Sequence, residues 1–187
     1  MMLIPSMYTD LIDFFSLNAS QVGLIFGIVS FFFGVGSLPM SFLYNKFGPK
    51  KLIAFSQFGI LISALLVSIS NTVLMFSLSS ILLGLFSSIH HPVSLTLISE
   101  TFEKNIAKAN AFHGVFGSIG VSLGPLISYF ALLNYSWHYA FIFTAILNAL
   151  LIPLSLKFIP NTEKMDIISF KDFNDSNQNS ILSIFFF

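Results

Sequence analysis

Two histidines in long apolar segments are the side chains of this sequence best suited to proton or substrate chemistry. Each belongs to a series of small, weakly polar residues at steps of three and four: Ser77, Ser80, Gly84, Ser87, His91 and Ser94, and then Asn110, His113, Gly117, Gly120 and Gly124. Such steps place each series on one face of a helix. Imidazole titrates near neutral pH, and ionisable groups within apolar spans usually face an interior. The spacing therefore predicts that His91, His113 and Asn110 line an internal cavity or carry a coupling proton.

Simpler roles for these histidines remain open. An interhelical hydrogen bond could join the two faces, or the rings could lie at helix ends in contact with water. A membrane metalloenzyme built around His90, His91 and His113 is a further alternative. Such sites need three or more converging ligands, usually with carboxylates, and the carboxylates of this chain lie at expected helix ends or in loops. We therefore predict no metal, no cofactor and no enzyme activity.

The composition places the chain in a lipid bilayer. Of 187 residues, 55% are hydrophobic and only 9% are charged, with a formal net charge of zero. Soluble domains carry about 25% charged residues, so a soluble enzyme is excluded. Disorder requires low hydrophobicity, and nucleic-acid binding requires a basic surface. The absence of cysteine excludes disulfides. What remains is an integral membrane protein whose partner is the lipid bilayer.

The charged residues divide the chain into apolar stretches that predict five helices. Three long stretches contain no charged residue. The first is long enough for one span, and the second and third are each long enough for two spans, at about 20 residues a span. Polar turns near residues 68–72 and 134–138 separate the paired spans. The expected helices cover 21–44, 50–69, 73–99, 108–132 and 138–158. We predict an all-α integral membrane protein.

The lysines predict the orientation of these helices. All eight lie in alternate connections, at 45–51, at 100–108 and after residue 157. The positive-inside rule makes these connections cytoplasmic. The C-terminus is then cytoplasmic as well. Within the second connection, Glu100, Lys104 and Lys108 could form an ion-pair gate at the inner side, or a solvated loop with weak salt bridges. We favour the solvated loop.

Both ends of the sequence are expected to belong to incomplete helices. Residues 1–20 combine a short apolar segment with Asp10 and Asp13, which predicts the end of a helix followed by an external loop. Residues 159–180 are polar and predict a cytoplasmic loop. The apolar run 181–187 predicts the start of a further helix.

Two motifs resemble those of the major facilitator superfamily of secondary transporters. The loop from Leu43 to Lys51 is similar to the family signature between helices 2 and 3, with matches at Lys46, Gly48 and Lys50. Asn45 stands where the family has an acidic residue. The run that contains Gly120, Gly124 and Pro125 resembles a Gly-Pro motif of helix 5, where it also fits close helix packing. His91-Pro92 and His113-Gly114 are most similar to the fosmidomycin-resistance branch.

The resemblance implies what the protein would do. It aligns the five spans with helices 2 to 6 of a twelve-helix carrier, which is part of the N-terminal six-helix bundle. It implies secondary transport of a small solute across the plasma membrane, with proton-coupled efflux as one mode, and a missing second half as partner. Asn45 cannot supply the signature's charge, and the chain contains no Arg for the proton-transfer role of helix 4. A truncated, non-transporting membrane protein or an assembly partner is the alternative.

Overall fold

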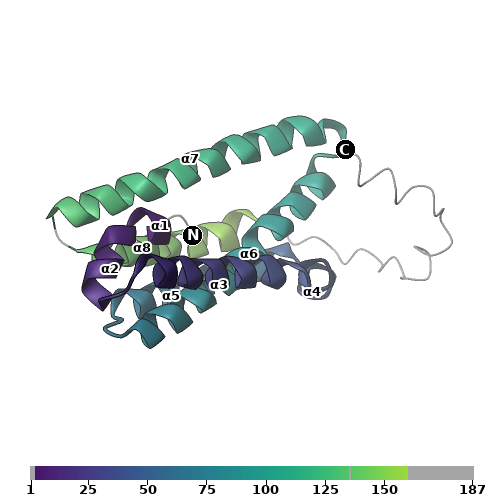
Figure 1. The fold of residues 1–187 in the computed structure, drawn as a ribbon. Helices are drawn as coiled ribbons and strands as arrows, with labels where there is room; N and C mark the ends of the chain where they lie inside the picture. The colour runs from purple at the N-terminus through teal and green to yellow at the C-terminus, as the bar shows by residue number, and fades with distance from the viewer. Residues whose placement is uncertain (1–2, 135, 160–187) are drawn as a thin grey trace, which may run out of the picture.

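The computed structural model describes residues 3–134 and 136–159, and every regular element in them is helical (Figure 1). The elements in chain order are α1 (Leu3–Ser6), α2 (Tyr8–Phe15), α3 (Ala19–Ser37), α4 (Met40–Phe47), α5 (Pro49–Ser68), α6 (Val73–Thr101), the 3₁₀ turn η1 (Glu103–Asn105), α7 (Ile106–Asn134) and α8 (Trp137–Phe158). Five of them, α3, α5, α6, α7 and α8, are long and apolar enough to cross a membrane. The predicted all-α membrane fold is confirmed.

Local side-chain chemistry fixes where the spans begin. Asn18 and Gln21 form a capping box at the start of α3, in which each side chain accepts a hydrogen bond from the other residue's backbone N–H. Thr72 caps α6 by accepting a hydrogen bond from the N–H of Met75. Pro49 occupies the first turn of α5, where its missing N–H leaves no intrahelical bond unmade. These caps satisfy backbone donors that a helix leaves free.

The helix expected over residues 21–44 is two helices in the structure. α3 ends at Ser37 and α4 begins at Met40. Pro39 lies at the junction, and proline has no N–H to donate within a helix and its ring clashes with the preceding turn. The N–H of Leu38 bonds to the carbonyl of Val35 in a tighter turn. The helix break at Pro39 was not predicted from the sequence, because the residues around Pro39 are uniformly apolar or small.

The N-terminal segment is helical where an external loop was expected. α2 carries Asp10 in its first turn, and Met7 and Leu11 are buried. These apolar side chains join a core cluster with Trp137 and Phe141 of α8. Burial of this apolar face explains why the segment folds. The expected loop at 159–180 beyond residue 159, and the expected helix start at 181–187, lie outside the described residues.

The spans pack as one group of four helices with a fifth beside it. α5 contacts α6 and α8, and α3 contacts α6. Figure 1 shows α7 running along the other side of the molecule, apart from α3. In the most apolar part of each helix, 50% of the residues of α5 are buried but only 11% of those of α7. α7 therefore presents most of its surface outward from the described chain.

Glycines allow close contacts among α3, α5 and α6, which are three of the four packed helices. A Cβ at Gly84 of α6 would lie 2.9 Å from the backbone oxygen of Val29 in α3. A Cβ at Gly59 of α5 would lie 2.1 Å from the ring of Phe86 in α6. In contrast, nothing lies within 4 Å of a Cβ at Gly23 or Gly27. The close α3–α6 contact at Val29 thus depends on Gly84, whereas Gly23 and Gly27 of α3 meet no neighbour among the described residues.

Gly84→Ala is expected to lower the free energy of unfolding by about 1–3 kcal/mol, because the new methyl group can be accommodated only if the α3 backbone moves. The measurement is thermal unfolding of the purified chain in detergent micelles, followed by the fluorescence of its one tryptophan, the buried Trp137. Gly27→Ala is the matched control. It adds the same methyl group in open space, and alanine favours a helix over glycine. Equal melting temperatures for Gly84→Ala and the unaltered chain would contradict the packing described here.

Candidate functional site

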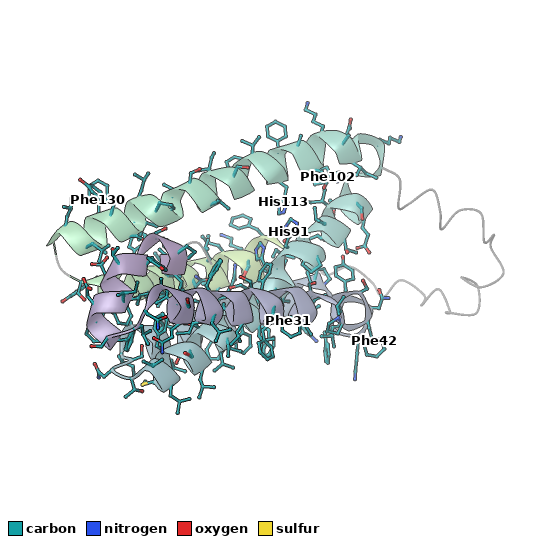
Figure 2. The ribbon with its side chains drawn as sticks, in the orientation of Figure 1. Phe31, Phe42, His91, Phe102, His113 and Phe130 are labelled. Carbon is teal, nitrogen blue, oxygen red and sulfur yellow. The ribbon has the colours of Figure 1, made fainter. Side chains whose placement is uncertain are left out.

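The structure brings His91 and His113 together from two helices. Their ring centroids lie 5.6 Å apart and their planes are inclined by 24°, a stacked arrangement. Figure 2 shows His113 extending from α7 toward His91 on α6. His113 is half-buried and His91 is exposed. The contact between the two series of small residues is therefore a ring stack, not the interhelical hydrogen bond that was one alternative.

The path of α6 makes this contact possible. Pro92 lies inside α6, which continues as one helix to Thr101. In Figure 1 the last turns of α6 rise away from the packed helices toward the start of α7. Pro92 cannot donate to the preceding turn and is the cause of such bends. α6 thus contacts α3 and α5 along its first part and reaches α7 only near its end.

Asn110 lies one turn before His113 on the same face of α7. Its side-chain oxygen, Oδ1, is buried and has no hydrogen-bond partner. An unpaired buried acceptor costs about 1–3 kcal/mol, so a donor placed here would be stabilised. His90 is directed differently, because its Nδ1 lies 3.4 Å from the hydroxyl of Ser94 on its own helix. In the described part of the chain, no three His, Asp or Glu side chains are grouped to hold a metal ion.

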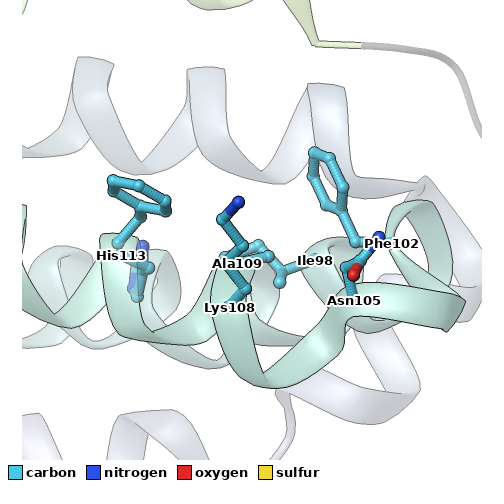
Figure 3. Close-up of a pocket in the computed structure, with 7 residues that line it drawn as sticks. Ile98, Phe102, Asn105, Lys108, Ala109 and His113 are labelled. Carbon is cyan, nitrogen blue, oxygen red and sulfur yellow. The ribbon is translucent and has the colours of Figure 1, made fainter.

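A cavity of about 480 Å³ opens between the end of α6 and the start of α7 (Figure 3). We call it the α6–α7 pocket; its lining residues are Ile98, Phe102, Asn105, Lys108, Ala109, Phe112 and His113. His113 therefore faces both the ring of His91 and this pocket. The sequence reading missed the pocket, although residues 105, 108, 109, 112 and 113 recur at helical spacing and signal a shared face.

The signature loop forms the turn between α4 and α5. Gly48 has φ 77° and ψ 160°, a backbone conformation that is essentially restricted to glycine. Asn45 is half-buried, and Lys46 is exposed with its Nζ 5.3 Å from the centre of the Phe47 ring. Lys50 is half-buried in the first turn of α5. Gly48 thus matches the glycine of the family signature because the turn requires a backbone conformation that other residues rarely adopt.

Glu100 does not form the ion pair considered for the inner loop. The hydroxyl of Tyr44 in α4 donates a hydrogen bond of 2.5 Å to its carboxylate Oε2. Among the described residues, Glu100 has no salt bridge to Lys104 or Lys108. The physical reason is direction: Glu100 faces α4, whereas Lys108 follows the η1 turn and lines the α6–α7 pocket. The sequence reading did not single out Tyr44, although it directly precedes Asn45 of the signature.

The Gly-Pro motif lies within α7, which continues through Pro125. Nothing lies within 4 Å of a Cβ built at Gly120. Ser128 donates a hydrogen bond of 3.0 Å to the carbonyl of Gly124 on the same helix. The packing role considered for this motif therefore has no partner at Gly120 among the described residues.

The chain is similar in sequence to known membrane transporters. A tetracycline resistance protein of class H from Pasteurella multocida is 27% identical over 190 residues, which covers 99% of this chain and 47% of that protein. An MFS-type transporter from Methanocaldococcus jannaschii is 28% identical over 156 residues, 79% of this chain and 40% of the relative. The probable nitrate transporter NarT of Staphylococcus aureus is 25% identical over 129 residues, 68% of this chain and 32% of the relative.

The chain therefore spans less than half the length of these curated relatives. Its sequence matches the Major Facilitator Superfamily over residues 1–183. The five apolar helices are those of a multi-pass membrane protein. With the signature turn at Gly48 and a match along nearly its whole length, the chain belongs to the Major Facilitator Superfamily.

Proposed function

We propose that this chain is part of a secondary transporter that moves a small solute across the plasma membrane, and that His91 and His113 bind the coupling proton. The observation that carries the proposal is the ring contact of 5.6 Å between the two histidines. The contact lets a charge on either ring act on the other at short range. Two imidazoles brought together from two helices could relay a coupling proton, because histidine commonly serves as a proton shuttle.

The distribution of titratable groups supports the assignment. Within the described spans, every Asp, Glu and Lys lies in the first or last turns of its helix. Away from the helix ends, α6 and α7 carry histidines at 90, 91 and 113, the residue type most often used for proton transfer. The unpaired Oδ1 of Asn110, one turn from His113, adds an acceptor beside them. Proton-coupled efflux would therefore depend on imidazole instead of carboxylate.

The inner side of the carrier is proposed to close through Tyr44 and Glu100. Asn45 is neutral and cannot act as the acidic residue of the signature. The hydrogen bond from Tyr44 joins the end of α4, which carries the signature, to a carboxylate at the end of α6. The lysine-rich connections at 45–51 and 100–108 lie at the ends of these same helices, which supports placing them, and the C-terminus, on the cytoplasmic side.

The proposed partner is a second half of the carrier. Alternating access in such transporters is a rocking of two halves about a central site, and the chain spans 47% of the class H tetracycline resistance protein. The test uses proteoliposomes that contain a pH-sensitive dye and a panel of anionic, cationic and neutral solutes. We expect solute-dependent proton movement when the chain is co-expressed with a C-terminal half. If no solute moves protons with or without that half, the chain is a non-transporting membrane protein.

In the assembled carrier, His91→Gln and His113→Gln are each expected to reduce solute-dependent proton movement at least about tenfold, equivalent to about 1.4 kcal/mol. Glutamine keeps a polar side chain but does not titrate. His138→Gln is the matched control, because His138 lies at the first turn of α8 and bonds Ser136 instead. Unchanged proton movement in both test variants, or an equal loss in His138→Gln, would contradict the assignment.

A double-mutant cycle with Tyr44→Phe and Glu100→Gln is expected to give an interaction energy of about 1–2 kcal/mol, because a hydrogen bond to a charged group contributes more than a neutral one. The measurement is unfolding of the four proteins in detergent micelles. Both substitutions keep the size of the side chain, so packing changes cancel in the cycle. Strict additivity of the two losses would show that the Tyr44–Glu100 bond does not hold α4 to α6.

A further inference from the structure

The α6–α7 pocket has the dimensions and walls of a small-molecule site. Its volume of about 480 Å³ lies within the 300–1,000 Å³ range of ligand pockets. The apolar side of the pocket is formed by Ile98 and Phe102 from the end of α6, and by Ala109 and Phe112 from α7. Such a wall binds the hydrocarbon part of a ligand, because burying it removes apolar surface from water.

The polar side of the pocket carries positive charge. Among the residues whose side chains the structure describes, its polar lining consists of Lys108, His113 and the amide of Asn105, with no Asp or Glu. Lys108 forms no salt bridge with any described residue. Figure 3 shows the Lys108 side chain between the ends of the pocket that His113 and Phe102 mark. Lys108 is exposed, so its ammonium group is hydrated, and an anion in the pocket would form a charge-assisted hydrogen bond with it.

We propose that the α6–α7 pocket binds a small organic anion with an apolar body, an aromatic or branched monocarboxylate. The inference rests on the proposed function, because it names the class of solute for the site that contains His113. A cation would be repelled by Lys108, and a neutral solute would leave its charge unpaired. An inorganic anion would gain nothing from the rings of Phe102 and Phe112. An anion here would also offset the positive charge of a protonated His113.

The test measures binding to the 187-residue chain in nanodiscs of zwitterionic phosphatidylcholine. The probe is 3-phenylpropionate, observed by saturation-transfer NMR, with 3-phenylpropionamide and 3-phenylpropylamine as its neutral and cationic counterparts. We expect the carboxylate to bind at least about tenfold more tightly than either counterpart, as for a charge-assisted hydrogen bond. Equal binding of the amide and the carboxylate would overturn the proposal.

Variants locate the site. Lys108→Gln is expected to weaken binding of 3-phenylpropionate at least about tenfold, and Lys108→Arg to restore most of it. Lys104→Gln is the matched control, because Lys104 lies in the same connection but does not line the pocket. Melting temperatures show whether each variant is folded. Full binding by folded Lys108→Gln, or an equal loss in Lys104→Gln, would overturn the proposal.

An anionic phospholipid shares the chemistry of the proposed ligand. A second binding experiment therefore distinguishes a phospholipid from a soluble carboxylate. The binding experiment is repeated in nanodiscs that contain phosphatidylglycerol. Retained binding of 3-phenylpropionate supports a soluble carboxylate. If its binding is lost, and Lys108→Gln lowers the amount of phosphatidylglycerol that the chain retains, the pocket binds lipid and the proposal is overturned. Binding requires no transport, so failure of the proteoliposome assay leaves this result standing. Proton movement driven by other solutes without carboxylate binding would overturn only the inference about the pocket.

Discussion

Direct contact between the backbones of α3 and α6 is the constraint on which the rest of the structure depends. In lipid, burial of apolar side chains does not drive helices together, so small residues and hydrogen bonds must do so. Gly84 allows that approach at Val29. Two hydrogen bonds extend the packing: Ser56 of α5 donates to the carbonyl of Phe86, and Ser155 of α8 donates to the buried side chain of Gln57. α6 is thereby held on two sides along its first part.

The remaining part of α6 carries two groups that face different neighbours. His91 meets His113 of α7, and Glu100 accepts a hydrogen bond from Tyr44 of α4. Glu100 follows His91 by nine positions, which is about 14 Å along the helix. Because the segment is one continuous helix, a displacement that breaks the Tyr44 bond also moves His91 relative to α7. The fold therefore links the inner end of the signature loop to the histidine pair mechanically.

The sequence predicts the spans well because charged side chains are excluded from lipid. Their positions along the chain therefore mark where the spans end. Pro39 shows its limit: a helix break inside an apolar run leaves the hydropathy unchanged and depends on backbone geometry. The faces of His91 and His113 followed from helical spacing, but their contact depends on the direction of α6 after Pro92. The partner of Glu100 lies 56 residues away in the chain, so no local pattern could identify it. The α6–α7 pocket likewise exists only once two helices are placed side by side.

In the proposed carrier, Glu100 of α6 would supply the carboxylate that Asn45 cannot supply in the signature loop. A carboxylate in the loop itself would lie beside Lys46 and the free N–H groups at the start of α5, where a negative charge is already stabilised. A carboxylate at the end of α6 instead requires a donor from across the helix interface, which the buried Tyr44 supplies. The carboxylate therefore belongs to the helix that also carries His91. In the proposed carrier, closure of the inner side and proton binding by the histidine pair would both act on the same helix, α6.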